Sequence, residues 1–301
     1  MSLIHWDRLV TSELVLVSIC QLFYIFVLVM LIRSEKSTFR KAYFHVFIYT
    51  GLVDICLALA VQLFRATRRL GLGPEFQYFG IFLSYLTGTN FSMHVFGNFL
   101  LTFCMYTAVC WPFDYAQIWK RPRAFYYIGL VTVISLLSYV EVFRTRRVYT
   151  LQEDGSYTDR NVADMPSLYI VGALTSFFYL FTSLFMVMRT LCAIRRVSVN
   201  SPNYRRQDKS LVFVALVDSL VFSADVLYEL DHLWGELLFS PDFSQFINLQ
   251  FNFYLAVMYC MNPFVLLILN RSARAEVFRR GIVENIAYKE STPGSPARVE
   301  K

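Results

Sequence analysis

Charged residues are scarce in this chain of 301 residues: Asp, Glu, Lys and Arg make up 17% of it, whereas hydrophobic residues make up 56%. Soluble domains carry about 25% charged residues, so the composition argues against a soluble protein. Common catalytic motifs are also absent, since the sequence has no CxxC pair, HExxH, GxxxxGK[ST] or GxSxG, and its four histidines are dispersed. We therefore expect no enzyme, no metal site and no cofactor.

The six cysteines form no disulfide or metal-binding pattern. In membrane segments cysteine most often acts as a small packing residue, and this is the role we expect here. All six lie inside apolar stretches or at their ends, and none lies where an extracellular disulfide could form: Cys20, Cys56, Cys104, Cys110, Cys192 and Cys260.

Long apolar runs dominate the chain. Each of the seven is long enough for a spanning helix, which needs about 20 residues to cross about 30 Å of hydrocarbon. They predict an all-α membrane protein with a seven-transmembrane helix bundle at 10–270, between an N-terminal segment 1–9, a short amphipathic helix at 271–283 and a disordered tail at 284–301. The third run is too long for the membrane, and we expect 104–112 to project into an aqueous edge. The runs span 10–32, 42–64, 79–112, 125–143, 166–191, 210–230 and 246–270.

Lys and Arg are unequally shared between the connecting segments. The segments 33–41, 113–124, 192–209 and 271–301 carry 19 of them, whereas 1–9, 65–78, 144–165 and 231–245 carry 8. Because basic residues are retained on the cytoplasmic side, we expect the N-terminus outside, and the amphipathic helix and tail in the cytoplasm. The net charge of +6 does not indicate a nucleic-acid partner, because the basic residues border helix ends, where they meet lipid head groups or an acidic partner.

Polar residues inside the third run follow a helical spacing. Thr87, Asn90, His94 and Asn98 are separated by 3, 4 and 4 positions, which places them on one face of a helix. Polar side chains in a membrane helix usually face protein or water, so this face should look into the bundle. Interhelical hydrogen bonds that merely hold neighbouring helices together would explain the same stripe, and both interpretations stay open.

The sixth run carries an acidic row. Asp218, Asp225 and Glu229 are 7 and 4 positions apart, and the latter two approach the outer surface in the predicted orientation. An outer acidic pair could attract a cationic or hydrogen-bonding ligand, although a solvated helix end is the alternative. We predict an outer cavity for a small molecule, walled by Phe and Tyr side chains and touched by Thr87, Asn90, Asp225 and Asn252.

Several short motifs resemble those of rhodopsin-like G-protein-coupled receptors. Asp54 in the segment GLVDICLALA resembles their second-helix acidic motif, and Asn262-Pro263 resembles their seventh-helix motif. The segment MYTAVCWPFDY, at 105–115, resembles the end of their third helix. The order of these motifs along the chain is that of the family.

A closer resemblance is to the nematode serpentine chemoreceptors of the gamma superfamily, which includes classes gamma and V. It rests on Pro112, followed seven residues later by Trp119, and on the segment KSTFRKAYF at 36–44. The chain departs from the wider pattern in four ways. Met105 stands where the family usually has an Arg in the third helix, Leu266 replaces the Tyr of the seventh-helix motif, the sixth run has no Pro, and the cysteines for a disulfide between the third helix and the second outer loop are absent. The first departure weakens the expectation of strong coupling to a G protein.

The resemblance implies a multi-pass receptor of the plasma membrane that transmits the binding of an external small molecule to a heterotrimeric G protein. It places Asp54 and Asn262 on facing helices, and with His94 and Asn98 we expect them to form a buried polar cluster that changes partners on activation. A static structural network is the alternative. The expected G-protein-facing residues are Met105, Tyr106, Pro112, Trp119, Arg195, Arg196, Arg205 and Arg206.

Two other functions stay open. A channel or transporter would use the intramembrane acids Asp54, Asp218 and Asp225 as an ion path. A non-signalling partner subunit of another receptor is favoured by Met105. Pairing of two receptor chains into a dimer also stays open.

Overall fold

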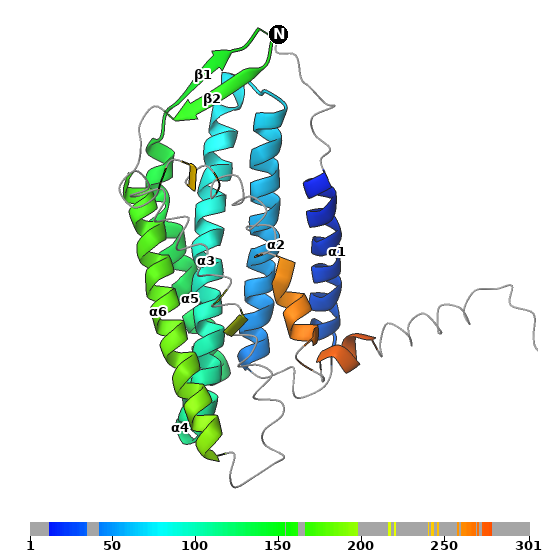
Figure 1. Cartoon of the computed structure of the whole chain (residues 1–301), viewed down its shortest axis with the longest axis vertical. Coiled ribbons are helices and arrows are strands. Elements are labelled where there is room, and N and C mark those ends of the chain that lie inside the picture. Colours follow the sequence, from blue (N-terminus) through cyan, green and yellow to red (C-terminus); the bar gives the residue numbers. More distant parts are fainter. Residues whose placement is uncertain are drawn as a thin grey trace, which may run out of the picture.

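Long helices make up most of the described chain. The computed structural model describes residues 12–34, 42–153, 155–161, 166–197, 260–268 and 273–278, and the single positions 216, 217, 220, 240, 242, 243, 246, 258 and 270. Within them five helices are long and apolar enough to cross a membrane, and they stand side by side (Figure 1). Helices suit these runs because hydrocarbon offers backbone N–H and C=O groups no other partner. They are α1 (Ser12–Ile32), α2 (Ala42–Arg69), α3 (Gln77–Cys110), α5 (Arg121–Ser138) and α6 (Pro166–Val197).

Two of the seven predicted spans lie largely outside the described residues. The run at 210–230 has only three described positions, and the run at 246–270 is described mainly at 260–268, which is helical. The number of spans and the sidedness of the termini therefore stay predictions. Part of the predicted amphipathic helix is described, and 273–278 is helical.

The third helix is longer than a membrane needs and ends abruptly. Its 34 residues measure about 51 Å at 1.5 Å per residue. Proline lacks an N–H and clashes with the preceding turn, so Pro112 cannot continue α3; it instead opens the short helix α4 (Pro112–Ile118), which the sequence analysis did not predict. The 3-10 turn η3 (Pro74–Phe76) precedes α3.

The end of α3 packs against the segment that follows it, and its projection past the membrane edge stays a prediction. Cys104, Met105 and Thr107 are buried, and the segment after Pro112 contacts two of them. The Cys104 thiol contacts the Tyr115 hydroxyl at 3.5 Å, and Trp119 Nε1 donates a hydrogen bond of 2.8 Å to Thr107 Oγ1. The chain segment after Pro112 thus covers one side of this helix end.

A small antiparallel hairpin, which the sequence did not predict, accompanies the predicted helices. After the 3-10 turn η4 (Val140–Arg144), strand β1 (Arg147–Leu151) pairs with β2 (Tyr157–Asn161). The hairpin caps one end of the bundle, over α2 and α3 (Figure 1); we call this the hairpin end. The backbone N–H of Tyr157 donates to the Gly71 carbonyl oxygen at 3.1 Å, and Gly71 adopts φ +62°, which suits glycine because it has no Cβ.

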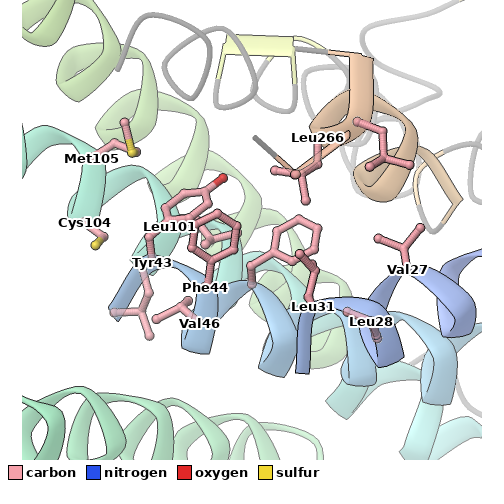
Figure 2. Close-up of a cluster of buried hydrophobic side chains, with 14 of the residues drawn as sticks. Val27, Leu28, Leu31, Tyr43, Phe44, Val46, Leu101, Cys104, Met105 and Leu266 are labelled. Atoms are coloured by element: carbon pink, nitrogen blue, oxygen red, sulfur yellow. The ribbon is translucent and has the colours of Figure 1, made fainter. Parts of the chain in front are cut away.

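The largest apolar core lies at the end of the bundle opposite the hairpin. It joins side chains of α1, α2 and α3 to Leu266 of the segment 260–268 (Figure 2). Helices α2 and α3 cross closely there, since a methyl group at Gly97 would lie 2.5 Å from Thr50 Oγ1. Helix α3 also contacts α5 and α6, so it is the central helix of the described bundle.

Candidate functional site

Asp54 lies at the centre of a buried polar cluster, which we define as Tyr24, Asp54, His94, Asn98 and Asn262. The buried residues of α2 recur at helical spacing around Asp54, so the sequence of α2 turns this carboxyl group into the bundle. The Asp54 side chain is 0% exposed. A carboxylate withdrawn from solvent requires hydrogen-bond donors, and neighbouring segments supply them.

Three donors from three segments converge on the Asp54 carboxylate. The Tyr24 hydroxyl of α1 donates to Oδ2 at 2.9 Å, and Asn262 Nδ2 donates to the same oxygen at 3.1 Å. His94 Nδ1 of α3 contacts the other oxygen, Oδ1. One carboxylate therefore links α2 to α1, to α3 and to the segment 260–268.

The protonation of His94 is linked to the contact that its second ring nitrogen, Nε2, makes with Asn98. Asn98 Nδ2 lies 3.0 Å from His94 Nε2, and an amide NH₂ group can only donate. With the amide nitrogen facing the ring, Nε2 would accept and Nδ1 would carry the proton that faces Asp54, which is the pattern of a neutral imidazole. Rotating the Asn98 amide by half a turn would present its oxygen to Nε2, which suits the doubly protonated imidazolium. The charge of His94 and the orientation of Asn98 are thereby coupled.

Tyr24 reaches Asp54 because α2 has no side chain at Gly51. A methyl group there would lie 3.0 Å from both Cε2 and Oη of Tyr24, and 2.9 Å from Leu28 Cδ2. Tyr24 was not among the predicted site residues. The sequence does contain a pattern that could have identified it: Gln21 and Tyr24 are two polar side chains three positions apart in an apolar run. Gln21 also faces the bundle, and its Nε2 lies 3.7 Å from the Cys260 thiol.

The predicted ligand-binding residues are only partly described. Thr87 is half-buried and its hydroxyl donates to the Leu83 carbonyl oxygen at 2.9 Å, while Asn90 is buried. Asp225 and Asn252 lie outside the described residues. The four residues of the polar stripe do share one helix, and its lower half, His94 and Asn98, belongs to the cluster around Asp54.

Two of the predicted G-protein-facing residues are buried. Met105 and Trp119 are each 5% exposed, so neither presents a contact surface in this structure. Met105 packs in the apolar core beside Leu101 and Cys104 (Figure 2), and the Trp119 ring lies against Phe103, with ring centroids 5.9 Å apart. The Trp119 ring also contacts Tyr127 of α5, with ring centroids 5.6 Å apart, so this residue links α4 and α5 to α3.

Some of the other predicted residues of that surface are at least partly exposed, and the rest lie outside the described residues. Pro112 and Arg195 are exposed, and Tyr106 is half-buried against Trp111, with ring centroids 5.3 Å apart. The side chain of Arg196 and the whole of Arg205 and Arg206 lie outside the described residues. Of the four predicted basic residues of this surface, only the side chain of Arg195 is described.

The helical segment 273–278 docks on the end of α1. Ser34 Oγ donates a hydrogen bond of 3.0 Å to Glu276 Oε1, and Ala273 and Val277 are buried. Phe278 is exposed. The predicted amphipathic character thus takes the form of one apolar edge against the bundle core and one exposed aromatic side chain.

Comparison with known proteins assigns the chain to a family. A family model described as the serpentine type 7TM GPCR chemoreceptor Srv matches residues 14–282. No curated protein was found to match the chain. The family match includes every residue of the polar cluster as well as the Pro112 to Trp119 motif. The chain therefore belongs to the Srv family of serpentine seven-transmembrane G-protein-coupled chemoreceptors, which are multi-pass membrane proteins.

Proposed function

We propose that this receptor binds a small molecule from outside the cell and passes a helix rearrangement to a heterotrimeric G protein at the plasma membrane. Family membership supports the receptor role. The observation that carries the transmission step is the Asp54 carboxylate, whose partners come from α1, α3 and the segment 260–268. Because its donors sit on separate elements, a shift of any one of these elements must break or rebuild a bond to a buried charge.

In this proposal the cluster is the switch between receptor states. A buried carboxylate without donors is costly, so only arrangements that supply other donors are populated. A cell-based reporter of G-protein signalling tests the idea: Asp54→Asn should change basal or maximal signalling while surface expression persists. Unchanged signalling at equal surface expression would show that the cluster is a static structural network and not a switch.

The proposed stimulus site lies toward the hairpin end, around Thr87, Asn90, Asp225 and Asn252. The helical register supports this, because Thr87 and Asn90 precede the cluster residues His94 and Asn98 on α3. If Asp225 accepts a bond from the ligand, Asp225→Asn should weaken the response to an identified agonist by about 1.5–3 kcal/mol, the range for bonds to charged groups. An unaltered dose response at normal expression would remove Asp225 from the site.

The proposed G-protein surface consists of basic residues with apolar insertions at the opposite end: Tyr106, Pro112, Arg195, Arg196, Arg205 and Arg206. Replacing Arg205 and Arg206 by Ala should reduce agonist-driven signalling with surface expression intact, because an acidic, partly helical partner would lose two positive charges. The matched control replaces Arg144 and Arg146, an exposed basic pair beside the hairpin, and should leave signalling unchanged.

A second function, that of a partner subunit without its own signalling, is favoured by the burial of Met105 in the apolar core. The wider family usually has an Arg at this position of the third helix, whereas Met105 carries no charge. Expression alone and together with a related signalling receptor separates the two functions. Signalling by the chain alone, after a screen of volatile and water-soluble metabolites, supports the receptor; signalling only on co-expression supports the subunit. Ionic current in the same cells would favour a channel.

A further inference from the structure

Helix α5 packs against α2 and α3 with one side and exposes the other. Only 17% of its apolar span is buried, against 61% for the span that contains α3. Its buried residues are Ala124, Val131 and Ser135, and intervals of 7 and 4 positions place them on one side of the helix. The opposite side faces away from the described helices, and in a multi-pass membrane protein the medium on that side is lipid.

The outward side of α5 carries a continuous apolar stripe. Four side chains follow one another on it at intervals of 4, 3 and 4 positions: Tyr126, Leu130, Val133 and Leu137. This is the spacing of one helix face, and the four side chains are between 46% and 67% exposed. The stripe is about 16 Å long, from the helical rise per residue, which is close to half of the hydrocarbon thickness of about 30 Å. One acyl chain of a lipid can therefore lie along it.

Three basic residues stand where this stripe begins. Lys120, Arg121 and Arg123 are all exposed, and they lie just before or within the first turn of α5. Arg123 precedes Tyr126 by three positions, so the two residues share a side of the helix. Because the apolar stripe follows them directly, the three positive charges lie at the depth of the lipid head groups.

Among the described residues, no carboxylate forms an ion pair with these three cations. The Cζ atom of Arg121 lies 5.9 Å from the centroid of the Phe125 ring, and Arg123 Nη1 donates a hydrogen bond of 2.8 Å to the Gln117 carbonyl oxygen. An aromatic ring and a carbonyl oxygen hold a guanidinium group without cancelling its charge. The nearest acidic residue in the sequence is Asp114 of α4. The cluster therefore keeps its positive charge for an external partner.

We propose that the first turn of α5 binds the head group of an anionic phospholipid whose acyl chain lies along the stripe. The phosphate and carboxylate oxygens of a lipid such as phosphatidylserine can accept hydrogen bonds from the guanidinium and ammonium groups. The stripe favours a membrane lipid over a free anion, because it extends the site into the hydrocarbon. The predicted orientation places this end of α5 in the cytoplasmic leaflet, which carries the anionic lipids. None of the three basic residues belongs to the proposed G-protein surface.

The test is site-resolved cross-linking of the full-length receptor in phosphatidylcholine nanodiscs. Each sample contains a small share of phosphatidylserine or phosphatidylcholine that carries the same photoreactive acyl chain, and cross-links to residues 124–143 are quantified by mass spectrometry. The phosphatidylserine probe should label this segment about tenfold more than the phosphatidylcholine probe, the order of preference expected when two or more basic residues attract the head group. Glycerophosphoserine, the same head group without acyl chains, should not compete at equal concentration.

Charge removal at the two ends of α5 gives matched variants. Replacing Lys120 and Arg121 by Gln should reduce the phosphatidylserine preference to about twofold or less, because the attraction grows with each basic residue near the surface. The control replaces Arg144 and Arg146 by Gln. These two arginines are also exposed, but Glu141 is exposed on the same 3-10 turn as Arg144 and supplies an opposite charge. The control should therefore keep the wild-type preference.

Four outcomes would overturn the site. They are equal labelling by both probes, an unchanged preference after the change at Lys120 and Arg121, an equal loss of preference in the control, and competition by glycerophosphoserine. The side chains of Lys120 and Arg121 make no hydrogen bond to the described residues, so we expect that variant to fold, and thermal unfolding checks it. If it does not fold, Arg123→Gln decides. Signalling is not measured, so failure here would leave the proposed receptor mechanism untouched.

Discussion

Asn262 and Asp54 are 208 positions apart in the chain, and Asn262 Nδ2 donates a 3.1 Å hydrogen bond to Asp54 Oδ2. The Tyr24 hydroxyl donates to the same oxygen at 2.9 Å. A single carboxylate oxygen thus receives donors from α1 and from the segment 260–268, while His94 occupies the other. The cluster can be tested bond by bond, because each donor can be removed separately.

Removing the Tyr24 hydroxyl should destabilise the receptor while preserving its core packing. Tyr24→Phe keeps the ring beside Gly51 and deletes one donor to a buried carboxylate, for which we expect a loss of about 1.5–3 kcal/mol in the free energy of unfolding. The measurement is thermal unfolding in nanodiscs. Tyr126→Phe, which changes an exposed tyrosine of α5, is the control. Equal melting temperatures for the two variants would show that the Tyr24 bond contributes nothing.

Asp54 and His94 should be energetically coupled. Asp54→Asn and His94→Gln each break the contact between them, so the double variant should lose less stability than the two single losses added together. We expect a difference of about 0.5–3 kcal/mol, the range for residues in contact. The same double-mutant cycle can be read in basal signalling. Strictly additive effects in both measurements would show that the two residues are not coupled, even if each proved important alone.

Gly51→Ala and Gly129→Ala should act in opposite directions. At Gly51 the new methyl group would collide with Tyr24 and Leu28, and overpacking of this kind costs about 1–3 kcal/mol. At Gly129, on α5, nothing lies within 4 Å of an added Cβ, so the better helix propensity of Ala should stabilise by up to about 1 kcal/mol. Unfolding temperatures of both variants check the difference. Stabilisation by Gly51→Ala would contradict the close approach of α1 and α2.

Introducing a charge at Met105 should be poorly tolerated. The side chain is packed beside Leu101 and Cys104 in the apolar core, where a guanidinium would be withdrawn from solvent at a cost of several kcal/mol. Met105→Arg should therefore reduce surface expression, whereas Met105→Leu, which nearly conserves volume, should cost less than about 1.5 kcal/mol. Normal expression of Met105→Arg with increased coupling would instead show that this end of α3 opens in the signalling state.

The sidedness of the termini can be measured directly. A tag after Met1 should be reachable by antibody on intact cells, and a tag after Lys301 only after permeabilisation, because the basic residues favour a cytoplasmic C-terminus. The hairpin should then be extracellular, and a tag between β1 and β2 should label intact cells as well. The opposite pattern would expose the proposed G-protein surface to the wrong compartment and remove the coupling proposal.

Local periodicity explains what could be predicted from the sequence. Apolar runs marked the five long helices because a helix in hydrocarbon needs only its own backbone to satisfy its hydrogen bonds. The spacing of Thr87, Asn90, His94 and Asn98 identified the inward face of α3, since a helix places such residues on one side. Family motifs added Asp54 and Asn262. These features depend on neighbouring positions or on short segments, and they can therefore be predicted from the sequence alone.

Only the tertiary structure decided which groups meet. Tyr24 joins Asp54 because Gly51 lets α1 approach α2. Met105 is buried in the apolar core, and Trp119 is buried where its indole N–H bonds Thr107 of α3. Arg68 and Arg147 share one aromatic ring because a hairpin between α5 and α6 docks over α2 and α3. Such contacts depend on the rotation and offset of whole elements, which the sequence specifies through many weak packing interactions at once. The sequence therefore predicted which residues would face the bundle, but it did not predict which side chains they would contact.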